Sequence, residues 1–285
     1  MNYVHENNLI KKIGDNYNNH GAEIKDFYEE VYKVYRDELE SLDYLSKDIN
    51  TFREATDLIN QYLLKIKELV EKCGIQSQSK LKSSFIEEIS IYLFRNLPLI
   101  KDKTFGIYNK NIFTGLKIDN TMKLGYTSKD VDFCIAKEME LVVDGTQELT
   151  IIVPIVCVEL KTYLDSTMFE GIQWSSKQIK GACPYAKTYV LMEYNAVASE
   201  NIIVARYDNN LNELFALREN KNAPLSPETL LEYYKEISET VEHAKLEDPI
   251  EKPGRLLNRN RWFSYSTDSE NLLEYYEKIS DTNEH

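Results

Sequence analysis

Apolar residues in the first third of the chain recur at the three- and four-residue spacing of one helix face. This pattern predicts two or three helices over residues 22–73 and another helix over residues 78–96, which ends before Pro98. Residues 1–22 are polar and rich in asparagine, and we expect a loose arm there. Residues 1–77 are therefore predicted to form a helical N-terminal region.

The pattern changes after residue 130, where isoleucine and valine become frequent. We expect a strand over 131–138 and a long buried strand over 149–163, joined by a hairpin turn at residues 144–145. Beyond the hairpin, the pattern predicts a helix over 166–183, strands over 188–194 and 201–207, and acidic amphipathic helices over 226–244 and 268–280. The fold class is therefore α/β, a mixed sheet flanked by helices, with a core over 78–210 and a helical C-terminal region over 211–285.

Composition restricts the class of protein. The net charge of −13 argues against a protein that coats DNA without specificity, but it does not exclude a local basic surface. No stretch reaches the roughly 18 apolar residues of a membrane span, and the N-terminus lacks the features of a signal peptide. We therefore expect a soluble cytoplasmic protein with no membrane partner. The scattered cysteines are expected to be reduced core thiols: Cys73, Cys134, Cys157 and Cys183.

Two charged residues interrupt the apolar strand predicted over 149–163. Side chains two positions apart in a strand share a face, so Glu159 and Lys161 point the same way. A buried carboxylate and a buried ammonium are both costly unless they are paired or bound to a metal. Taken alone, the pair is explained more simply as an ion pair at the exposed end of the strand, because Glu-x-Lys is a common sequence.

The hairpin adds a third charged residue to this face. If the turn has two residues, Val143 lies opposite Thr146, and Asp132 falls on the face of the Glu-x-Lys pair, one diagonal step from Glu159. A one-residue bulge would break this parity. Asp130 has the same parity and is the alternative. Asp132 is preferred because an apolar strand starts directly after it.

Two carboxylates and a lysine at the end of a sheet suit phosphodiester hydrolysis. Asp132 and Glu159 supply the hard oxygen ligands that Mg²⁺ takes, and the bound ion polarises a phosphate and lowers the pKa of a water. Lys161 then stabilises the charge of the transition state and orients, or helps to deprotonate, the attacking water. The sequence therefore predicts a Mg²⁺-dependent nuclease with these three catalytic residues, of which the two acids are metal ligands.

This arrangement resembles the PD-(D/E)XK nuclease superfamily, whose signature is an acid at the start of one strand and (Asp/Glu)-x-Lys on the next. The matching residues are Asp132 and Glu159-x-Lys161, and the resemblance covers about residues 78–195. Val131 stands where the superfamily usually has proline, which is a frequent departure. The resemblance implies a restriction-endonuclease-like fold, with one helix before the hairpin and another after the second strand.

The two flanking helices supply accessory candidates. On the leading helix, Glu88 lies at the edge of the apolar face and Glu87 points to solvent, so Glu88 is the candidate for a metal or supporting role. On the trailing helix, Gln173 and Lys177 lie on the side from which superfamily members often direct a glutamine or lysine at the site. The simpler alternatives are a solvated helix flank and an ordinary solvated lysine.

The run from Glu159 to Gly171 is more specifically similar to the BbvCI group of type II restriction endonucleases. Those enzymes use two different subunits, each with one active site, to cut an asymmetric sequence. The resemblance implies a sequence-specific endonuclease that acts on double-stranded DNA with a second, non-identical nuclease subunit. The sequence leaves a second copy of this chain open as the partner.

A loop over 253–262 is the clearest candidate for DNA contact, because it is rich in arginine and asparagine and contains no acid. Arginine binds guanine edges and phosphates, and asparagine binds adenine. The alternative is that the loop docks on acidic helices of the protein itself. The candidate DNA-binding residues, expected to line the cleft of the catalytic acids, are Arg255, Asn258, Arg259 and Arg261.

Two other interpretations fit parts of the pattern. A structure-specific repair or junction-resolving nuclease would use the same superfamily core. A non-catalytic helical interaction protein would keep Glu159 and Lys161 as a plain ion pair. Mg²⁺-dependent cleavage of DNA separates the nucleases from the interaction protein. An RNA-binding module is disfavoured, because the sequence has no RNP, KH or glycine-rich signature.

Overall fold

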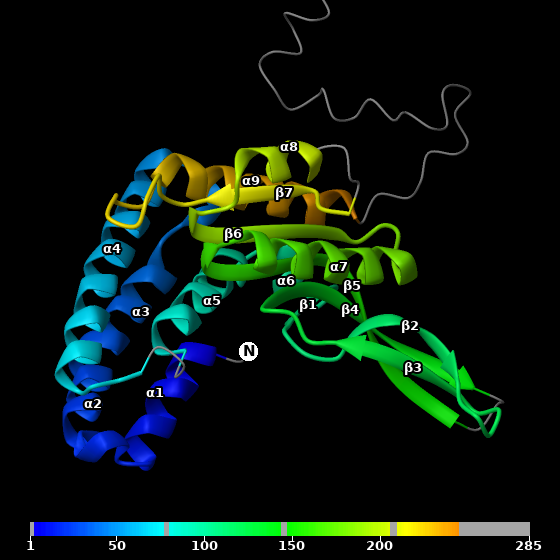
Figure 1. Cartoon of the computed structure of the whole chain (residues 1–285), viewed down its shortest axis with the longest axis horizontal. Coiled ribbons are helices and arrows are strands. Elements are labelled where there is room, and N and C mark those ends of the chain that lie inside the picture. The colour runs from blue at the N-terminus through cyan, green and yellow to red at the C-terminus, as the bar shows by residue number, and fades with distance from the viewer. Residues whose placement is uncertain (1–2, 77–79, 144–146, 206–209, 245–285) are drawn as a thin grey trace, which may run out of the picture. The chain divides into compact units, whose positions relative to one another are not determined.

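The computed structural model of the chain describes residues 3–76, 80–143, 147–205 and 210–244 (Figure 1). All of them belong to one unit, Met1–Lys245. The helix predicted over 268–280 lies outside the described residues. The same is true of the candidate DNA-binding residues Arg255, Asn258, Arg259 and Arg261.

Helices account for most of the chain up to Lys101, as the apolar spacing predicts. The α-helices are α1 (Val4–Gly14), α2 (Gly21–Phe27), α3 (Lys33–Ser41), α4 (Ile49–Lys72), α5 (Leu81–Phe94) and α6 (Pro98–Lys101). The short helical segments between them are η1 (Tyr17–Asn19), η2 (Tyr28–Tyr32) and η3 (Tyr44–Ser46). Their apolar faces share one core with α9 (Pro227–His243), which confirms the helix predicted over 226–244. Many of the chain's tyrosines are buried in this core, among them Tyr32, Tyr62, Tyr92, Tyr233 and Tyr234.

Helix α1 shows that the expectation of a loose arm over residues 1–22 is wrong. His5, the second residue of the helix, is fully buried. The carboxylate of Glu88 accepts hydrogen bonds from the backbone N–H groups of His5 and Glu6 at 2.9 and 3.2 Å. N–H groups in the first turn of a helix have no partner within it, so this distant carboxylate takes the place of a local cap. Because the cap is far away in the chain, the local sequence carries no signal for it.

The seven strands of the described residues form one mixed sheet. They are β1 (Gly106–Tyr108), β2 (Ile112–Ile118), β3 (Leu124–Lys129), β4 (Phe133–Val143), β5 (Gln147–Leu164), β6 (Lys187–Asn195) and β7 (Glu213–Ala216). The long strand β5 is central: it pairs antiparallel with β4 along one edge and parallel with β2 and β6 along the other. The mixed sheet with flanking helices confirms the predicted fold class.

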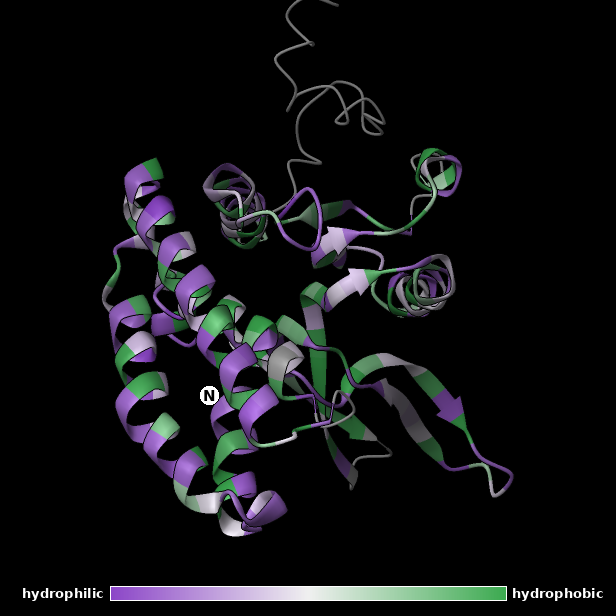
Figure 2. Cartoon of the chain, turned by 60° about the vertical axis from the view of Figure 1, so that its left-hand side comes forward, coloured by the Kyte–Doolittle hydropathy of each residue, from purple (hydrophilic) through white to green (hydrophobic). Residues whose placement is uncertain are grey.

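The two faces of β4 and β5 pack against different layers. Phe133 and Ile135 contribute to the core that contains α5 and α9, whereas Cys134 and Cys157 pack with Ile179 of α7 (Ser166–Ala182). Figure 2 shows the N-terminal helices on one side of the sheet and α7 on the other. The four cysteines are free and buried, as predicted.

The chain after β6 differs from the prediction. The strand expected over 201–207 is wrong, because α8 (Ser199–Ala205) occupies that stretch. Strand β7 lies in the range predicted as a helical C-terminal region, and it pairs with β6. A short run of isoleucine and valine does not distinguish a strand from a helix. A strand at residues 201–207 would need a free edge of the sheet, and β7 already pairs with the edge of β6. No helix in the described part of the chain is long and apolar enough to cross a membrane.

Candidate active site

Asp132, Glu159 and Lys161 converge where β4 begins and β5 approaches its end. The Nζ atom of Lys161 lies 2.6 Å from Asp132 Oδ2 and 2.9 Å from Glu159 Oε2. The backbone N–H of Leu160 donates a hydrogen bond to Asp132 Oδ2 at 2.8 Å, which holds this carboxylate against the neighbouring strand. The prediction that the three side chains share one face is confirmed, and their catalytic roles stay predictions.

The strand register that brings them together differs from the expected one. Val143 pairs with Gln147 rather than with Thr146, so the connection is one residue longer than a two-residue turn, and a bulge further along shifts the pairing by one more residue. Either change alone would turn Asp132 to the opposite face, because successive strand residues point to opposite faces. Together they restore the parity, and Asp132 stands beside Glu159 rather than diagonally from it.

Asp130, the alternative first acid, takes a different position. It is exposed, and its Oδ1 accepts a hydrogen bond from the backbone N–H of Asn111 at 3.1 Å. The next residue, Val131, is buried, and its backbone N–H donates to the carbonyl oxygen of Asn109 at 3.1 Å. Asp130 therefore holds the loop before β2, and the geometry favours Asp132 as the first acid of the site.

The three charged groups are partly buried and influence one another. The exposed fractions of the side chains are 23% for Asp132, 18% for Glu159 and 26% for Lys161. Burial raises the pKa of Glu159, Lys161 opposes this increase, and Asp132 adds to it. Burial disfavours the ammonium of Lys161, but the carboxylates of Asp132 and Glu159 outweigh it and raise the pKa of Lys161. Lys161 is therefore protonated at neutral pH and acts as the cation between the two acids.

This arrangement fits a divalent cation. Within the described residues, no group of three or more acidic, histidine or cysteine side chains is placed to hold a metal. Mg²⁺ does not need such a group, because it is usually bound through one or two carboxylates and keeps several waters. Asp132 and Glu159 are two hard oxygen donors that already share one positive charge, supplied by Lys161. They are therefore the residues that would hold Mg²⁺.

Glu87, rather than Glu88, is the third acid near this pair. Glu87 and Asp132 line the same cavity of about 20 Å³, which has room for about one water molecule. Burial first, and then the Asp132 carboxylate, raise the pKa of Glu87 to about 7, against the lowering effect of Lys80 and Lys161. A cation bound nearby would relieve this repulsion, so Glu87 is a candidate for a contact with the ion through a water.

Glu88 faces away from the site, and its predicted position is wrong. It is fully buried: its Oε1 accepts hydrogen bonds from the hydroxyls of Tyr32, at 2.7 Å, and Tyr92, while Oε2 accepts from the backbone of His5 and Glu6. The helical pattern fails here because none of the described side chains of α5 is exposed, since the helix packs on α1 and α4 as well as on β5. A pattern of apolar positions separates a core face from a solvent face, but not two buried environments.

A lysine that sequence reasoning missed lies beside the trailing helix α7. Gln173 is half-buried and Lys177 is exposed on α7, and neither bonds to the three central residues within the described chain. Their accessory roles stay predictions. Lys129, the last residue of β3, donates a hydrogen bond to Ser175 of α7, and its charge partly opposes the burial that raises the pKa of Glu159. Only the folded hairpin brings it there, so no local motif marks it.

Comparison with known proteins decides the family. The sequence model of the Bpu10I restriction endonuclease family matches residues 78–243, a span that contains the whole described sheet and the three central site residues. The chain belongs to the Bpu10I restriction endonuclease family. Among solved structures, it is similar to a chain of the native BbvCI A2B2 tetramer, with 15% identity and a TM-score of 0.66, covering 85% of this chain and 98% of that chain. Among curated proteins, none matches.

Membership of the Bpu10I family identifies the chain as a nuclease of the restriction type. The structural likeness to BbvCI, at this low identity, shows the fold alone, and that fold is the restriction-endonuclease-like one that the sequence predicted. The two findings support the predicted resemblance to a type II restriction endonuclease of the BbvCI kind. They also remove the non-catalytic helical interaction protein from the hypotheses.

Proposed function

We propose that this chain is a catalytic subunit of a type II restriction endonuclease that hydrolyses phosphodiester bonds of double-stranded DNA at a specific sequence with Mg²⁺. The observation that carries the proposal is the convergence of two carboxylates, Asp132 and Glu159, on the ammonium of Lys161 at one end of β5. Family membership supports the class of reaction. A structure-specific repair nuclease has no observation in its favour.

The residues of the site divide the work. Asp132 and Glu159 would hold Mg²⁺, with Glu87 beside them; bound there, the ion polarises a phosphate and lowers the pKa of a water. Lys161 lies within hydrogen-bond distance of both acids. A phosphate that approaches an ion held by these acids would therefore also come close to the ammonium of Lys161. Its raised pKa favours charge stabilisation and orientation of the attacking water over abstraction of a proton.

A second active site is needed to cut both strands, because one such site acts on one strand. The similar solved structure is an A2B2 tetramer of BbvCI, which contains two kinds of subunit. We therefore propose a second, non-identical nuclease subunit as the partner.

DNA contact is proposed for the basic loop over residues 253–262. Removing one of its phosphate contacts should reduce the slope of log affinity against log salt by about one. The candidate residues of the loop are Arg255, Asn258, Arg259 and Arg261.

The test is cleavage of plasmid and phage DNA by the full chain together with its partner subunit in Mg²⁺. Wild type is expected to give discrete fragments. In the mixture, Asp132→Ala and Glu159→Ala should abolish cleavage of the strand that this chain cuts while binding in Ca²⁺ survives. Lys161→Ala should lower the rate on the same strand by about 10²–10⁴, so that each mixture nicks one defined strand. Lys65→Ala, at an exposed lysine of α4, is the control.

Two outcomes contradict the proposal. Cleavage near the wild-type rate by Glu159→Ala would overturn the site itself. The second is double-strand cleavage by a mixture whose only defect is Lys161→Ala. It would show that this chain is not responsible for cutting one defined strand, and the two-subunit arrangement would fail.

A further inference from the structure

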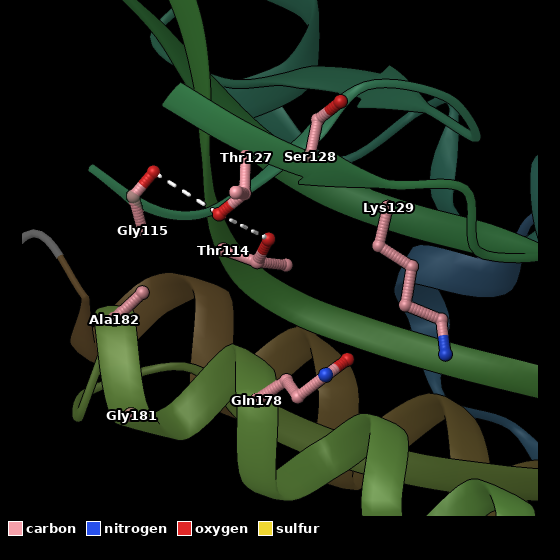
Figure 3. A pocket seen from close by; sticks show the side chains of 8 residues that line it. All are labelled: Thr114, Gly115, Thr127, Ser128, Lys129, Gln178, Gly181 and Ala182. Atoms are coloured by element: carbon pink, nitrogen blue, oxygen red, sulfur yellow. Dashed lines mark hydrogen bonds between the residues drawn. The ribbon is translucent and has the colours of Figure 1, made fainter. Parts of the chain in front are cut away.

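A cavity of about 450 Å³ lies between the β2–β3 hairpin and the C-terminal half of α7 (Figure 3). None of the described residues that line it is acidic, although the chain contains 47 aspartates and glutamates and has a net charge of −13. The lining residues are Thr114, Gly115, Thr127, Ser128, Lys129, Gln178, Gly181 and Ala182. The cavity is therefore a place on this acidic chain that an anion can approach without meeting a carboxylate in the wall.

The hairpin side of the cavity is fixed by hydrogen bonds of its own. The hydroxyl of Thr114 donates to the hydroxyl of Thr127 at 3.1 Å, and the hydroxyl of Thr127 donates to the carbonyl oxygen of Gly115 at 3.2 Å, as Figure 3 shows. Both threonine protons are thus used within the protein. These residues shape the wall, and the donors for a ligand must come from elsewhere.

Two side chains supply free donors. Within the part of the chain that the structure describes, the amide of Gln178 makes no hydrogen bond. Lys129 carries three N–H donors, of which one is directed at Ser175. Figure 3 shows Lys129 and Gln178 extending toward one another across the cavity from β3 and α7. An amide and an ammonium beside one space match the acceptor oxygens of a phosphate.

The cavity lies on the same side of the sheet as the active site. Cys157 of β5 packs against α7, and Glu159 shares its face because strand residues alternate. Lys129 lines the cavity and also acts electrostatically on Glu159, so one residue joins the two places. A DNA strand held at Glu159 would therefore pass the Lys129 end of the cavity.

We infer that this cavity binds a backbone phosphate of the DNA strand held at Asp132 and Glu159, other than the phosphate that is cut. The inference rests on the proposed nuclease function. The phosphate sits at the Lys129 end, because the last carbonyl groups of α7 make the opposite end negative. At that opposite end, Gly181 has no side chain, which leaves room for the neighbouring sugar.

The first test places a charge in the cavity. A Cβ atom added at Gly181 meets no atom within 4 Å, so this position of the wall has room for a side chain, and Gly181→Glu adds a carboxylate there. Gly181→Gln has the same size without the charge. Gly14→Glu, at a glycine of α1 with the same open space, adds the same charge to the bundle of N-terminal helices. Circular dichroism spectra are compared first, to confirm that all variants are folded.

Binding is measured by fluorescence anisotropy of a labelled mixed-sequence duplex with the full chain in Ca²⁺, over a series of salt concentrations. Gly181→Glu is expected to bind about tenfold more weakly than Gly181→Gln at low salt, because an added carboxylate repels the phosphate. Gly14→Glu is expected to bind like wild type. Lys129→Gln should reduce the slope of log affinity against log salt by about one, as for the loss of one phosphate contact. Lys65→Gln on α4 should leave the slope unchanged.

The outcomes separate this inference from the function on which it rests. If the wild-type chain binds no duplex at any salt concentration, in the presence of its partner subunit as well as alone, the nuclease function and the phosphate site both fail. If the wild-type chain binds, but Gly181→Glu matches Gly181→Gln and Lys129→Gln keeps the wild-type slope, the phosphate site alone is overturned.

Discussion

Replacing each of two adjacent glutamates of α5 by alanine is expected to have different effects: one change should lower the stability of the fold, and the other should impair the site. Glu88→Ala should destabilise the fold, because Glu88 accepts hydrogen bonds from two tyrosine hydroxyls and from two backbone N–H groups of α1. Each buried donor left without an acceptor costs about 1–3 kcal/mol, less where the group can turn to another partner or to water. We therefore expect a loss of about 3–5 kcal/mol, a large part of the roughly 5–15 kcal/mol that stabilises a typical protein.

Glu87→Ala should leave the fold intact and impair the site. Within the described residues, Glu87 makes no hydrogen bond, and its half-buried carboxyl is repelled by Asp132. Removing it therefore costs little or even stabilises the metal-free chain. If Glu87 supports the ion, its loss should weaken Mg²⁺ affinity by roughly 10–100-fold, as for other residues around a metal.

The assay has two arms, urea unfolding of the metal-free chain and the Mg²⁺ dependence of DNA cleavage. Glu88→Gln is the matched control: it keeps the size of the side chain and one acceptor oxygen, so its stability should fall between those of wild type and Glu88→Ala. A Glu88→Ala chain as stable as wild type would refute the surroundings assigned to Glu88. Unchanged Mg²⁺ dependence in Glu87→Ala would remove Glu87 from the site.

Three further predictions concern pH, metal and a buried ion pair. Because the pKa of Glu87 rises from its ordinary value of 4.5 to about 7, the folded chain holds a proton that the unfolded chain releases, so metal-free stability should fall as pH rises through this window. Glu87→Gln should flatten that fall by about 1–2 kcal/mol, discounted for partial exposure, in urea unfolding at pH 5 and pH 8; equal slopes would contradict it. Saturating Mg²⁺, at about 100 times its Kd, should stabilise wild type by roughly 2.7 kcal/mol in thermal unfolding but not Asp132→Ala or Glu159→Ala, and an equal shift in all three would place the ion elsewhere. Arg218 pairs with buried Glu193 at 3.0 Å, so Arg218→Ala should lose about 3–5 kcal/mol on urea unfolding, partly regained by adding Glu193→Gln; a loss that the second change leaves unaltered would contradict the pairing as its cause.

Features that depend on neighbouring residues in the chain could be predicted from the sequence. The placement of Glu159 and Lys161 on one face follows from the two-residue period of a strand, and it holds in the structure. The helices α5, α7 and α9 were predictable in the same way, because each carries a long run at helical spacing. The hairpin of β4 and β5 was marked by two apolar runs around a turn dipeptide.

Long-range pairing decided the rest. The sequence predicts that Asp132 joins the site, but from a turn one residue too short and without the bulge, and the two differences cancel. Bulges depend on how a whole strand is held by its neighbours, so no local signal marks them.

Burial of one element by several others was equally invisible in the sequence. Because α5 packs against helices and sheet, Glu88 is buried and Glu87 half-buried, and only tertiary contacts place Glu87 beside Asp132 and Glu88 at the cap of α1. Lys129 lies near Glu159 only because the β2–β3 hairpin folds over α7. Strand β7 joins the sheet because the edge of β6 is available to it. Local periodicity thus determined the elements and the Glu-x-Lys pair, whereas the third acid, the added lysine and the cap depend on contacts between distant segments, which the spacing of residues along a chain does not encode.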